Sequence, residues 1–316
     1  MPTESPWACA RMPAVVSSAR RGEALGGVLI ALASVQFGFV VILGKLVARA
    51  DISVFTMLAI RFGIAALALA VALIALRQPL VAASGEGGWL LVLGVVGYAV
   101  ESSLFFAALR HGQAAAVTLL FFTYPVFVAL ASMGLGRGAP GPLLGTALLC
   151  SVSGAALVIA LSGRIVISPI GVILALLSAV SFTAYLLGAD RVLQRTNSLT
   201  GSMWVAGAAS IALVAYAGAT GEVDAPPGAK QWLELAGMGV ATSGAFVCLF
   251  AGLRRLGPVR ASIVAAAEPL ATIVLAAVIL GESVRPWMAA GGALILAGAV
   301  AASVARAAPE AEPQVP

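Results

Sequence analysis

Long apolar stretches separated by short charged segments are the dominant pattern of this chain. An α-helix needs about 20 apolar residues to cross the hydrocarbon core of a bilayer. Ten stretches have or approach this length, so the pattern predicts ten transmembrane helices. The predicted spans are Ala24–Gly44, Ile52–Leu76, Gly87–Leu109, Gly112–Gly136, Gly138–Gly163, Ile165–Ala189, Thr196–Gly221, Leu235–Leu253, Ala261–Gly281 and Pro286–Ala305.

Membrane-spanning β-strands are the alternative for apolar stretches. Such strands alternate apolar and polar side chains over about ten residues, because one face meets lipid and the other a polar lumen. The stretches here are continuous and rich in Ala and Leu. Of the 316 residues, 61% are hydrophobic and 10% are charged, whereas a soluble domain is about 25% charged. The mean hydropathy is +1.06. The predicted fold class is therefore an all-α integral membrane protein.

The charged residues predict how the chain is oriented in the membrane. The net charge is +5, but Lys and Arg occur singly or in pairs between spans, without the basic stripe that binds nucleic acid. With the N-terminus inside, eleven of the 18 Lys and Arg lie in inner segments and six in outer ones. The positive-inside rule then places both termini in the cytoplasm of a multi-pass plasma-membrane protein. Residues 1–23 are expected to form a cytoplasmic tail, and residues 307–316 a disordered one.

The two halves of the chain align with each other at an offset of 144 residues. The stretch Leu109–Pro125, LRHGQAAAVTLLFFTYP, lies over Leu253–Pro269, LRRLGPVRASIVAAAEP, so that Pro125 coincides with Pro269. The predicted repeats, residues 24–163 and 164–306, contain five helices each. Because five is odd, the second repeat must enter the membrane upside down relative to the first. Inverted repeats of this kind are typical of secondary transporters, whose substrate sites lie near the midplane.

Three stretches resemble the drug/metabolite transporter superfamily, specifically its EamA-type members with ten helices in two five-helix repeats. They are AAEPLATIVLAAVILGE, LLFFTYPVFVALASMGLG and FTMLAIRFGIAALAL. The chain departs from the pattern in its first helix, SVQFGFVVILGK, where many relatives have a tryptophan before the glycine. The first repeat also ends in Gly136-Arg137, where the second ends in Gly281-Glu282. The resemblance implies a secondary transporter and leaves the substrate open.

Three ionisable residues lie inside predicted spans: Arg61, Glu101 and Glu268. Each costs about 2.5–3.5 kcal/mol to insert on translocon scales, so each is a candidate for function. Glu268 precedes Pro269, which removes a backbone donor and is expected to break the helix. Glu268 can line a cavity, binding a substrate amine or carrying a proton, or it can be satisfied by a neighbouring helix. Arg61 can bind a substrate carboxylate, or it can pair with either glutamate or snorkel.

Polar and aromatic side chains at mid-span depth are further candidates. They can surround a substrate, or they can serve helix packing and interfacial belts. Pro125 and Pro269 are the candidate hinges, and Tyr124 occupies the position equivalent to Glu268. With the three ionisable residues, the candidate substrate-binding residues are Gln36, Arg61, Tyr98, Glu101, Tyr124, Tyr185, Trp204 and Glu268.

Enzymatic and metal chemistry find no support in the sequence. The chain has one histidine, His111, and three cysteines without a C-x-x-C pair, and it lacks the P-loop, zinc-protease and serine-hydrolase motifs. We therefore expect no metal and no cofactor. The predicted function is alternating-access transport of a small organic metabolite, such as an amino acid or a drug-like solute, with export as the leading direction and proton coupling as a hypothesis. The alternatives are a membrane enzyme acting on lipid and a non-transporting scaffold or receptor.

Overall fold

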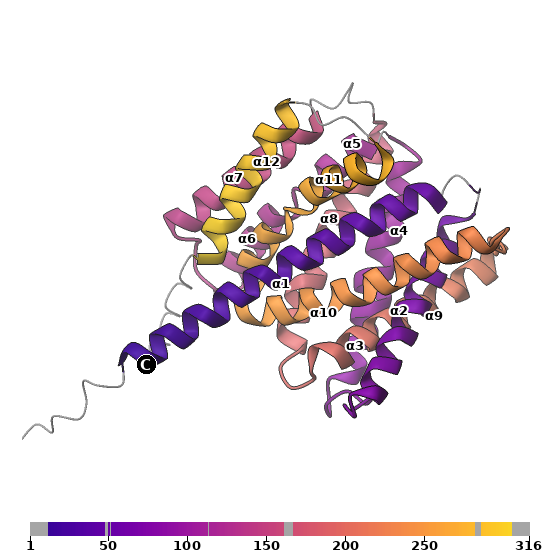
Figure 1. Ribbon diagram of the computed structural model, residues 1–316, viewed down its shortest axis with the longest axis horizontal. Helices are drawn as coiled ribbons and strands as arrows, with labels where there is room; N and C mark the ends of the chain where they lie inside the picture. Colours follow the sequence, from indigo (N-terminus) through magenta and orange to yellow (C-terminus); the bar gives the residue numbers. More distant parts are fainter. Residues whose placement is uncertain are drawn as a thin grey trace, which may run out of the picture.

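The computed structural model describes residues 12–47, 50, 52–112, 114–160, 167–281 and 286–304, and these ranges form a bundle of long helices (Figure 1). The first repeat contributes α1 (Met12–Val47), α2 (Val54–Ala75), α3 (Gly87–Val92), the π-helical segment η2 (Leu93–Ala99), α4 (Val100–Leu109), α5 (Ala114–Phe121), α6 (Tyr124–Gly134) and α7 (Pro142–Ala160). The second contributes α8 (Pro169–Val192), α9 (Ser198–Thr220), α10 (Ala229–Ala265), α11 (Glu268–Leu280) and α12 (Pro286–Val304).

These helices correspond to the ten predicted spans and confirm the all-α membrane fold. Six of them are long and apolar enough to cross a bilayer by themselves within the described ranges, and several shorter apolar helices accompany them. The third span is one continuous rod made of α3, η2 and α4. Helix α10 joins the eighth span to the start of the ninth across a kink at Gly257, whose φ of 72° lies in the left-handed region. Helix α1 begins at Met12, so residues 12–23 of the predicted cytoplasmic tail are helical and continuous with the first span.

The outward faces of the helices suit a lipid environment. Leu67 on α2 is 66% exposed, and Ile211 on α9 is 72% exposed. Lipid-facing backbone must satisfy its own hydrogen bonds, which a helix does and an irregular segment does not. The breaks in the fourth and ninth spans must therefore be covered by protein.

Both breaks occur at the same place in the two repeats. Residues 122–123 separate α5 from α6, and residues 266–267 separate α10 from α11. Helices α6 and α11 start at Tyr124 and Glu268, which are 144 residues apart, and a proline is the second residue of each. Proline fits there because its fixed φ suits a helical first turn, whose N–H would have no intrahelical partner. The register that the sequence alignment predicts is thus present in the backbone.

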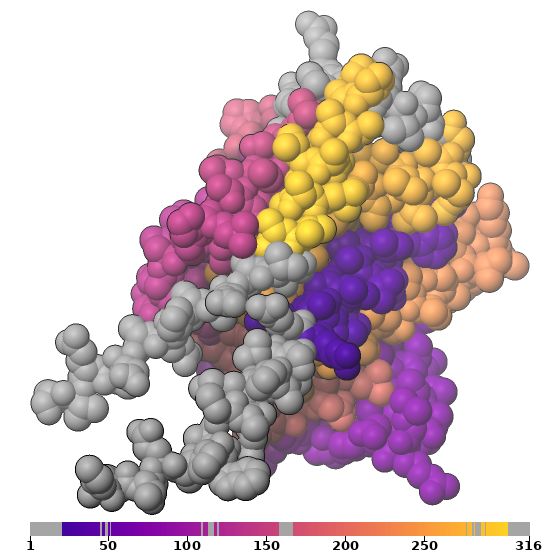
Figure 2. All heavy atoms as spheres, turned by 60° about the vertical axis from the view of Figure 1, so that its left-hand side comes forward, coloured from indigo at the N-terminus to yellow at the C-terminus, as the bar shows by residue number. Residues whose placement is uncertain are grey.

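Helices of one repeat pack mainly on helices of the other. The pairs α1 with α10, α2 with α9 and α7 with α12 are the main contacts of this kind, and Figure 2 shows yellow α12 beside magenta α7 on one side of the bundle. Glycines allow close approach, because a Cβ added to Gly154 of α7 would lie 2.6 Å from the carbonyl oxygen of Gly291. Small residues at contacts are a general feature of helix packing in membranes.

The pair α2 and α9 shows that the two repeats are inverted. At the start of α2, the Thr56 hydroxyl donates to the carbonyl oxygen of Glu222, just after α9, at 2.8 Å. At the start of α9, the hydroxyl of Thr200 donates to the carbonyl oxygen of Pro79, after α2, at 2.6 Å. Thr56 and Thr200 are equivalent at the offset of 144, yet they make these contacts at opposite ends of the bundle.

Candidate functional site

Arg61 of α2 is buried near the middle of the bundle, with 6% of its surface exposed. Its Nε donates to the hydroxyl of Thr242 on α10 at 2.7 Å, and that hydroxyl donates to the carbonyl oxygen of Met238 at 2.7 Å. The guanidinium carbon lies 4.8 Å from the ring centre of Phe62. Among the salt bridges between described residues, none includes Arg61. The Tyr98 side chain also hydrogen-bonds the guanidinium, so the cation is held by neutral hydroxyls and an aromatic ring rather than by a carboxylate.

Glu101, at the start of α4, is equally buried. Its carboxylate accepts hydrogen bonds from the hydroxyls of Ser102, at 3.0 Å, and Ser178 of α8, at 3.2 Å. The Ser178 hydroxyl lies at the same distance from the backbone carbonyl oxygen of Glu101. Hydroxyls thus orient this carboxylate, and no cation contacts it directly within the described ranges.

Glu268 is the first residue of α11 and is partly exposed, unlike the other two ionisable residues. A carboxylate at a helix N-terminus is stabilised by the free N–H groups and the helix dipole. Glu268 interacts electrostatically with Arg61, Glu101 and Tyr124. The structure therefore brings the three predicted ionisable residues into one region, without the direct ion pair that the structural alternative expects.

Aromatic rings surround this charged region. Tyr98 of η2 lies 5.1 Å from Tyr185 and 4.6 Å from Phe246, centre to centre. Phe182 lies 4.8 Å from Tyr124 and 5.8 Å from Tyr185, which joins the two tyrosines. The hydroxyl of Tyr185 is buried and has no hydrogen-bond partner in the described structure. Buried hydroxyls are nearly always paired, so this one is available to a polar group of a ligand.

The break in the ninth span is covered by residues of the first repeat. The Tyr124 hydroxyl donates to the carbonyl oxygen of Ser262 at 3.3 Å. The hydroxyl of Ser34 on α1 lies 3.3 Å from the carbonyl oxygen of Ala265 and 3.1 Å from that of Ile30, so it can donate to either. The Ser262 and Ala265 carbonyls lie in the last turn of α10 before the break. The Ser262 carbonyl also accepts from the N–H of Ala266 at 3.2 Å, whereas the residue four positions after Ala265 is Pro269, which has no N–H to donate. Tyr124 therefore supports the backbone that carries Glu268, besides contributing to the aromatic wall.

Gln36 and Trp204 lie outside this central group. The side chain of Gln36 packs between α1 and α10, where its Nε2 donates to the Leu32 carbonyl oxygen at 3.2 Å. The indole of Trp204 donates to the carbonyl oxygen of Leu80 at 2.9 Å. Trp204 also borders a groove of about 450 Å³ that is open to the outside between α2, α3 and α9. The structure therefore groups six of the eight predicted site residues and leaves these two apart.

Several residues of this region are absent from the sequence prediction. Thr242, Phe246, Phe182 and Ser178 all contact predicted site residues. Ser178 carried a weak signal, since it aligns with Ser34 in the repeat comparison. The others look like ordinary helix-packing residues in a sequence.

The repeat symmetry separates what the fold needs from what the site adds. At the offset of 144, Arg61 corresponds to Val205 and Glu101 to Ala245, and both of these apolar residues are fully buried. A Cβ on Gly239 would lie 3.0 Å from the carbonyl oxygen of Arg61, and one on Gly94 would lie 2.6 Å from that of Val205. A glycine of the other repeat thus approaches the backbone at both positions, beside a cation in one repeat and beside valine in the other. The architecture therefore does not require the charge.

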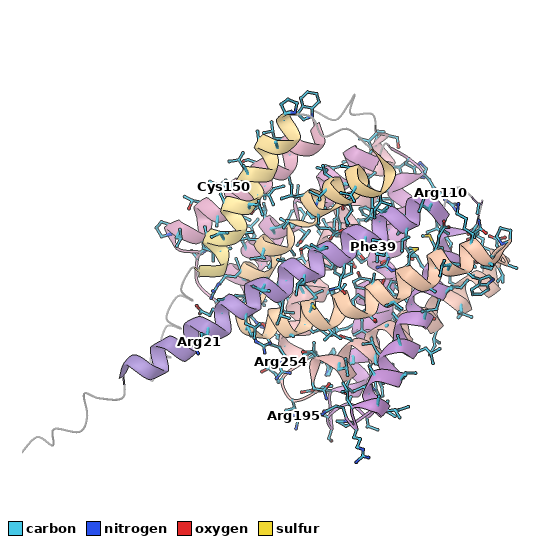
Figure 3. The ribbon with its side chains drawn as sticks, viewed as in Figure 1. Arg21, Phe39, Arg110, Cys150, Arg195 and Arg254 are labelled. Atoms are coloured by element: carbon cyan, nitrogen blue, oxygen red, sulfur yellow. The ribbon has the colours of Figure 1, made fainter. Side chains whose placement is uncertain are left out.

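Ion pairs gather at one end of the bundle, which we call the basic end and define by Arg137, Arg195 and Arg254. In Figure 3, Arg195 and Arg254 lie with Arg21 along one edge, whereas Arg110 lies at the opposite end. The salt bridges between described residues all lie here, and each joins the two halves of the chain. They are Arg137–Asp190 at 2.6 Å, Arg260–Glu23 at 3.1 Å and Arg195–Glu86 at 3.6 Å.

Glu86 is the most elaborately bonded carboxylate at the basic end. Its oxygens accept from the backbone N–H groups of Arg195 at 3.0 Å and Thr196 at 2.8 Å, and from the hydroxyl of Thr196. Burial pushes the pKa of Glu86 upward, but the hydrogen bonds from Thr196 and Arg195 and the charge of Arg195 outweigh it, so the pKa is lowered. The contact therefore favours the ionised form of Glu86.

A family model described as the EamA-like transporter family matches the chain twice, over residues 24–160 and 169–304. The chain belongs to the EamA-like transporter family. Membership implies a multi-pass membrane transporter of small solutes, and it agrees with the duplicated five-helix architecture. The described part of the chain contains no cluster of three or more His, Cys, Asp or Glu side chains able to hold a metal ion.

A solved structure titled "Crystal structure of protein" is similar to this EamA-like chain, with a TM-score of 0.75 and 21% sequence identity. The match covers 90% of this chain and 98% of the other. At this identity the likeness establishes the fold alone. No match was found among curated proteins.

Proposed function

We propose that this protein is a secondary transporter that exports a small organic metabolite across the plasma membrane by alternating access. The basic end is the cytoplasmic end, with both termini on that side, because basic segments are retained inside. The two moving units are the repeats 24–163 and 164–306, and Pro125 and Pro269 are the hinges. Support comes from the two helix breaks, which lie at equivalent positions in oppositely oriented halves.

The proposed substrate site is the region between Arg61, Glu101 and Glu268. One observation carries this proposal: the buried Arg61 and Glu101 and the partly exposed Glu268 lie in one region inside the bundle without a direct ion pair. Buried charges are costly unless they are paired, so such an arrangement favours a ligand that completes it. A solute with a carboxylate and an amine, such as an amino acid, has both complementary charges. Tyr98, Tyr124 and Tyr185 would contact its apolar part.

Gln36 and Trp204 have secondary roles in this proposal. Gln36 lies at the contact between α1 and α10, where it can influence the movement of α1 against α10. Trp204 lies at the level of the basic end, where it can anchor α9 at the membrane–water interface. Neither is required to contact the substrate.

The conformation described here supports a closed basic end. Three ion pairs join the halves there, and the site residues Arg61, Glu101, Tyr124 and Tyr185 are buried. Exposure of the site to the cytoplasm would require these inter-repeat contacts to separate. We propose further that Glu268 or Glu101 couples transport to protons. The test of this coupling is Glu268→Gln in a flux assay, where an unchanged pH dependence excludes Glu268 as the coupling residue.

Purified protein in liposomes loaded with a cell metabolite extract tests the proposal. Solutes that appear outside are identified by mass spectrometry and compared with those from protein-free liposomes. We expect at least one small solute to be released only by the protein. Identical profiles in the two preparations, for protein inserted in both orientations, would exclude a transporter of any solute in that extract.

A further inference from the structure

The hydrogen bond between Arg61 and Thr242 has a consequence for which ligands the site accepts. A guanidinium can bind a carboxylate side-on, through Nε and one terminal nitrogen, or end-on, through both terminal nitrogens. Here Nε donates to Thr242 at 2.7 Å and is already occupied. The Tyr98 side chain also hydrogen-bonds the guanidinium, and the N–H donors of the terminal nitrogens that remain are the ones able to form a bidentate contact.

Thr242 is well placed to hold the guanidinium in one orientation. Its side chain is fully buried, and its own proton is directed to the carbonyl oxygen of Met238 at 2.7 Å. The lone pairs of the hydroxyl are therefore left to accept from Arg61. On the other side, the Phe62 ring lies 4.8 Å from the guanidinium carbon. The plane of the group is thus restricted by two contacts from α2 and α10.

Gly239 makes this contact possible. It lies one helical turn before Thr242 and faces α2, where a Cβ would come within 2.5 Å of Ile64 and 3.0 Å of the Arg61 carbonyl oxygen. Any larger residue would move α10 away from α2 and lengthen the distance from Thr242 to Nε. Gly239 and Thr242 therefore form one unit that sets the position of Arg61.

The repeat symmetry indicates that this unit is specific to the site. Thr242 is equivalent to Tyr98 at the offset of 144, and Tyr98 also interacts with the guanidinium. The equivalent residues Thr242 and Tyr98 thus both contact the guanidinium of Arg61. The residue equivalent to Arg61 itself is the buried Val205. In the second repeat the same backbone has no cation to hold.

We propose that Thr242 is a positioning residue that directs the terminal nitrogens of Arg61 toward the carboxylate of the substrate, and that it thereby selects carboxylate-bearing solutes. The inference rests on the proposed transport function. It goes further by naming the anionic group, its binding geometry and the residue that enforces it.

The experiment uses the full-length protein in liposomes loaded with a metabolite extract that contains both carboxylate-bearing and carboxylate-free solutes, which serve as the probes. Thr242→Val keeps the shape of the side chain but cannot accept from Nε, and Thr242→Ser restores the hydroxyl. We expect Thr242→Val to raise the half-saturating concentration of carboxylate-bearing solutes about tenfold, with an unchanged maximal rate, because a hydrogen bond to a charged group is lost. Thr242→Ser should behave like the wild type.

Thr146→Val is the matched control, because the Thr146 hydroxyl bonds only the Leu143 carbonyl of its own helix. The melting temperatures of all variants confirm folding. The proposal is overturned if Thr242→Val keeps the wild-type half-saturation, if Thr242→Ser is as weak as Thr242→Val, or if the wild type releases only carboxylate-free solutes. In the last case the transport function stands and the carboxylate assignment falls. If the wild-type protein releases no solute, both the transport function and the carboxylate assignment are wrong.

Discussion

Replacing Arg61 by valine, the residue at its equivalent position in the other repeat, separates function from fold. Val205, the equivalent residue on α9, is fully buried, so the backbone at this position can accommodate a valine. Removing the arginine saves an insertion cost of about 3 kcal/mol. Against this, Glu101 and Glu268 lose a neighbouring cation, and a smaller side chain leaves space. We expect these terms to offset each other, so that the free energy of unfolding changes by less than about 2 kcal/mol.

Arg260 provides the matched comparison, because it is also buried, with 4% exposed, yet it has direct structural partners. It donates to the carbonyl oxygen of Ala302 at 2.9 Å and to the carboxylate of Glu23 at 3.1 Å. Removing one partner of a buried ion pair typically costs about 3–5 kcal/mol. Arg260→Val should therefore lower the melting temperature clearly more than Arg61→Val does.

The assay is thermal unfolding of both variants in the same detergent, together with release from loaded liposomes. Arg61→Val should melt close to the wild type and release carboxylate-bearing solutes at least about tenfold more slowly, since a charge-assisted contact is lost. The reasoning is refuted if Arg61→Val unfolds as readily as Arg260→Val. Arg61 would then be a structural residue that pairs with a glutamate, which is the alternative that the sequence left open.

The helix breaks were predictable from the sequence because their cause is local. A proline after a long apolar stretch removes a donor wherever it occurs, and its recurrence at Pro125 and Pro269 gave the register of the repeats. Arg61, Glu101 and Glu268 could be found for a similar reason, since a charge at mid-span depth is costly in any fold.

Other features depend on tertiary contacts that the sequence does not encode locally. Depth in a span does not say what a side chain contacts, so Trp204 looked equivalent to Tyr98 although Trp204 bonds the Leu80 carbonyl oxygen and Tyr98 packs on Phe246. The π-helical winding of η2 has no sequence signature either, and the equivalent stretch of α10, residues 237–243, is regular α-helix. Thr242 becomes recognisable only when α10 is packed against α2.

Three further predictions concern other parts of the molecule. Because the pKa of Glu86 is lowered in the folded protein, its contribution to stability should be complete at neutral pH and fade as the pH falls below its ordinary value of 4.5 toward its folded one. The difference in melting temperature between wild type and Glu86→Gln should accordingly shrink on acidification, and a difference that grows would contradict this. Gly94→Ala should cost about 1–3 kcal/mol in thermal unfolding, since its Cβ meets backbone, whereas Gly88→Ala, with open space around it, should cost far less. Equal effects would refute the packing argument. Tyr185→Phe should not lower the melting temperature, because the hydroxyl has no partner in the described structure, but it should raise the half-saturating substrate concentration several-fold if that hydroxyl bonds the ligand; unchanged half-saturation would remove it from the site.

The most direct test of the central claim, that Arg61, Glu101 and Glu268 serve transport and not the fold, is a metabolite comparison with one combined variant. Arg61→Val, Glu101→Ala and Glu268→Tyr together give each position the residue of its symmetry equivalent. Growth media from cells that make equal membrane levels of wild type and variant are compared with media from cells without the protein. We predict a solute that accumulates outside only with the wild type, while the variant melts within a few degrees of it. The same accumulation with both proteins would contradict the account.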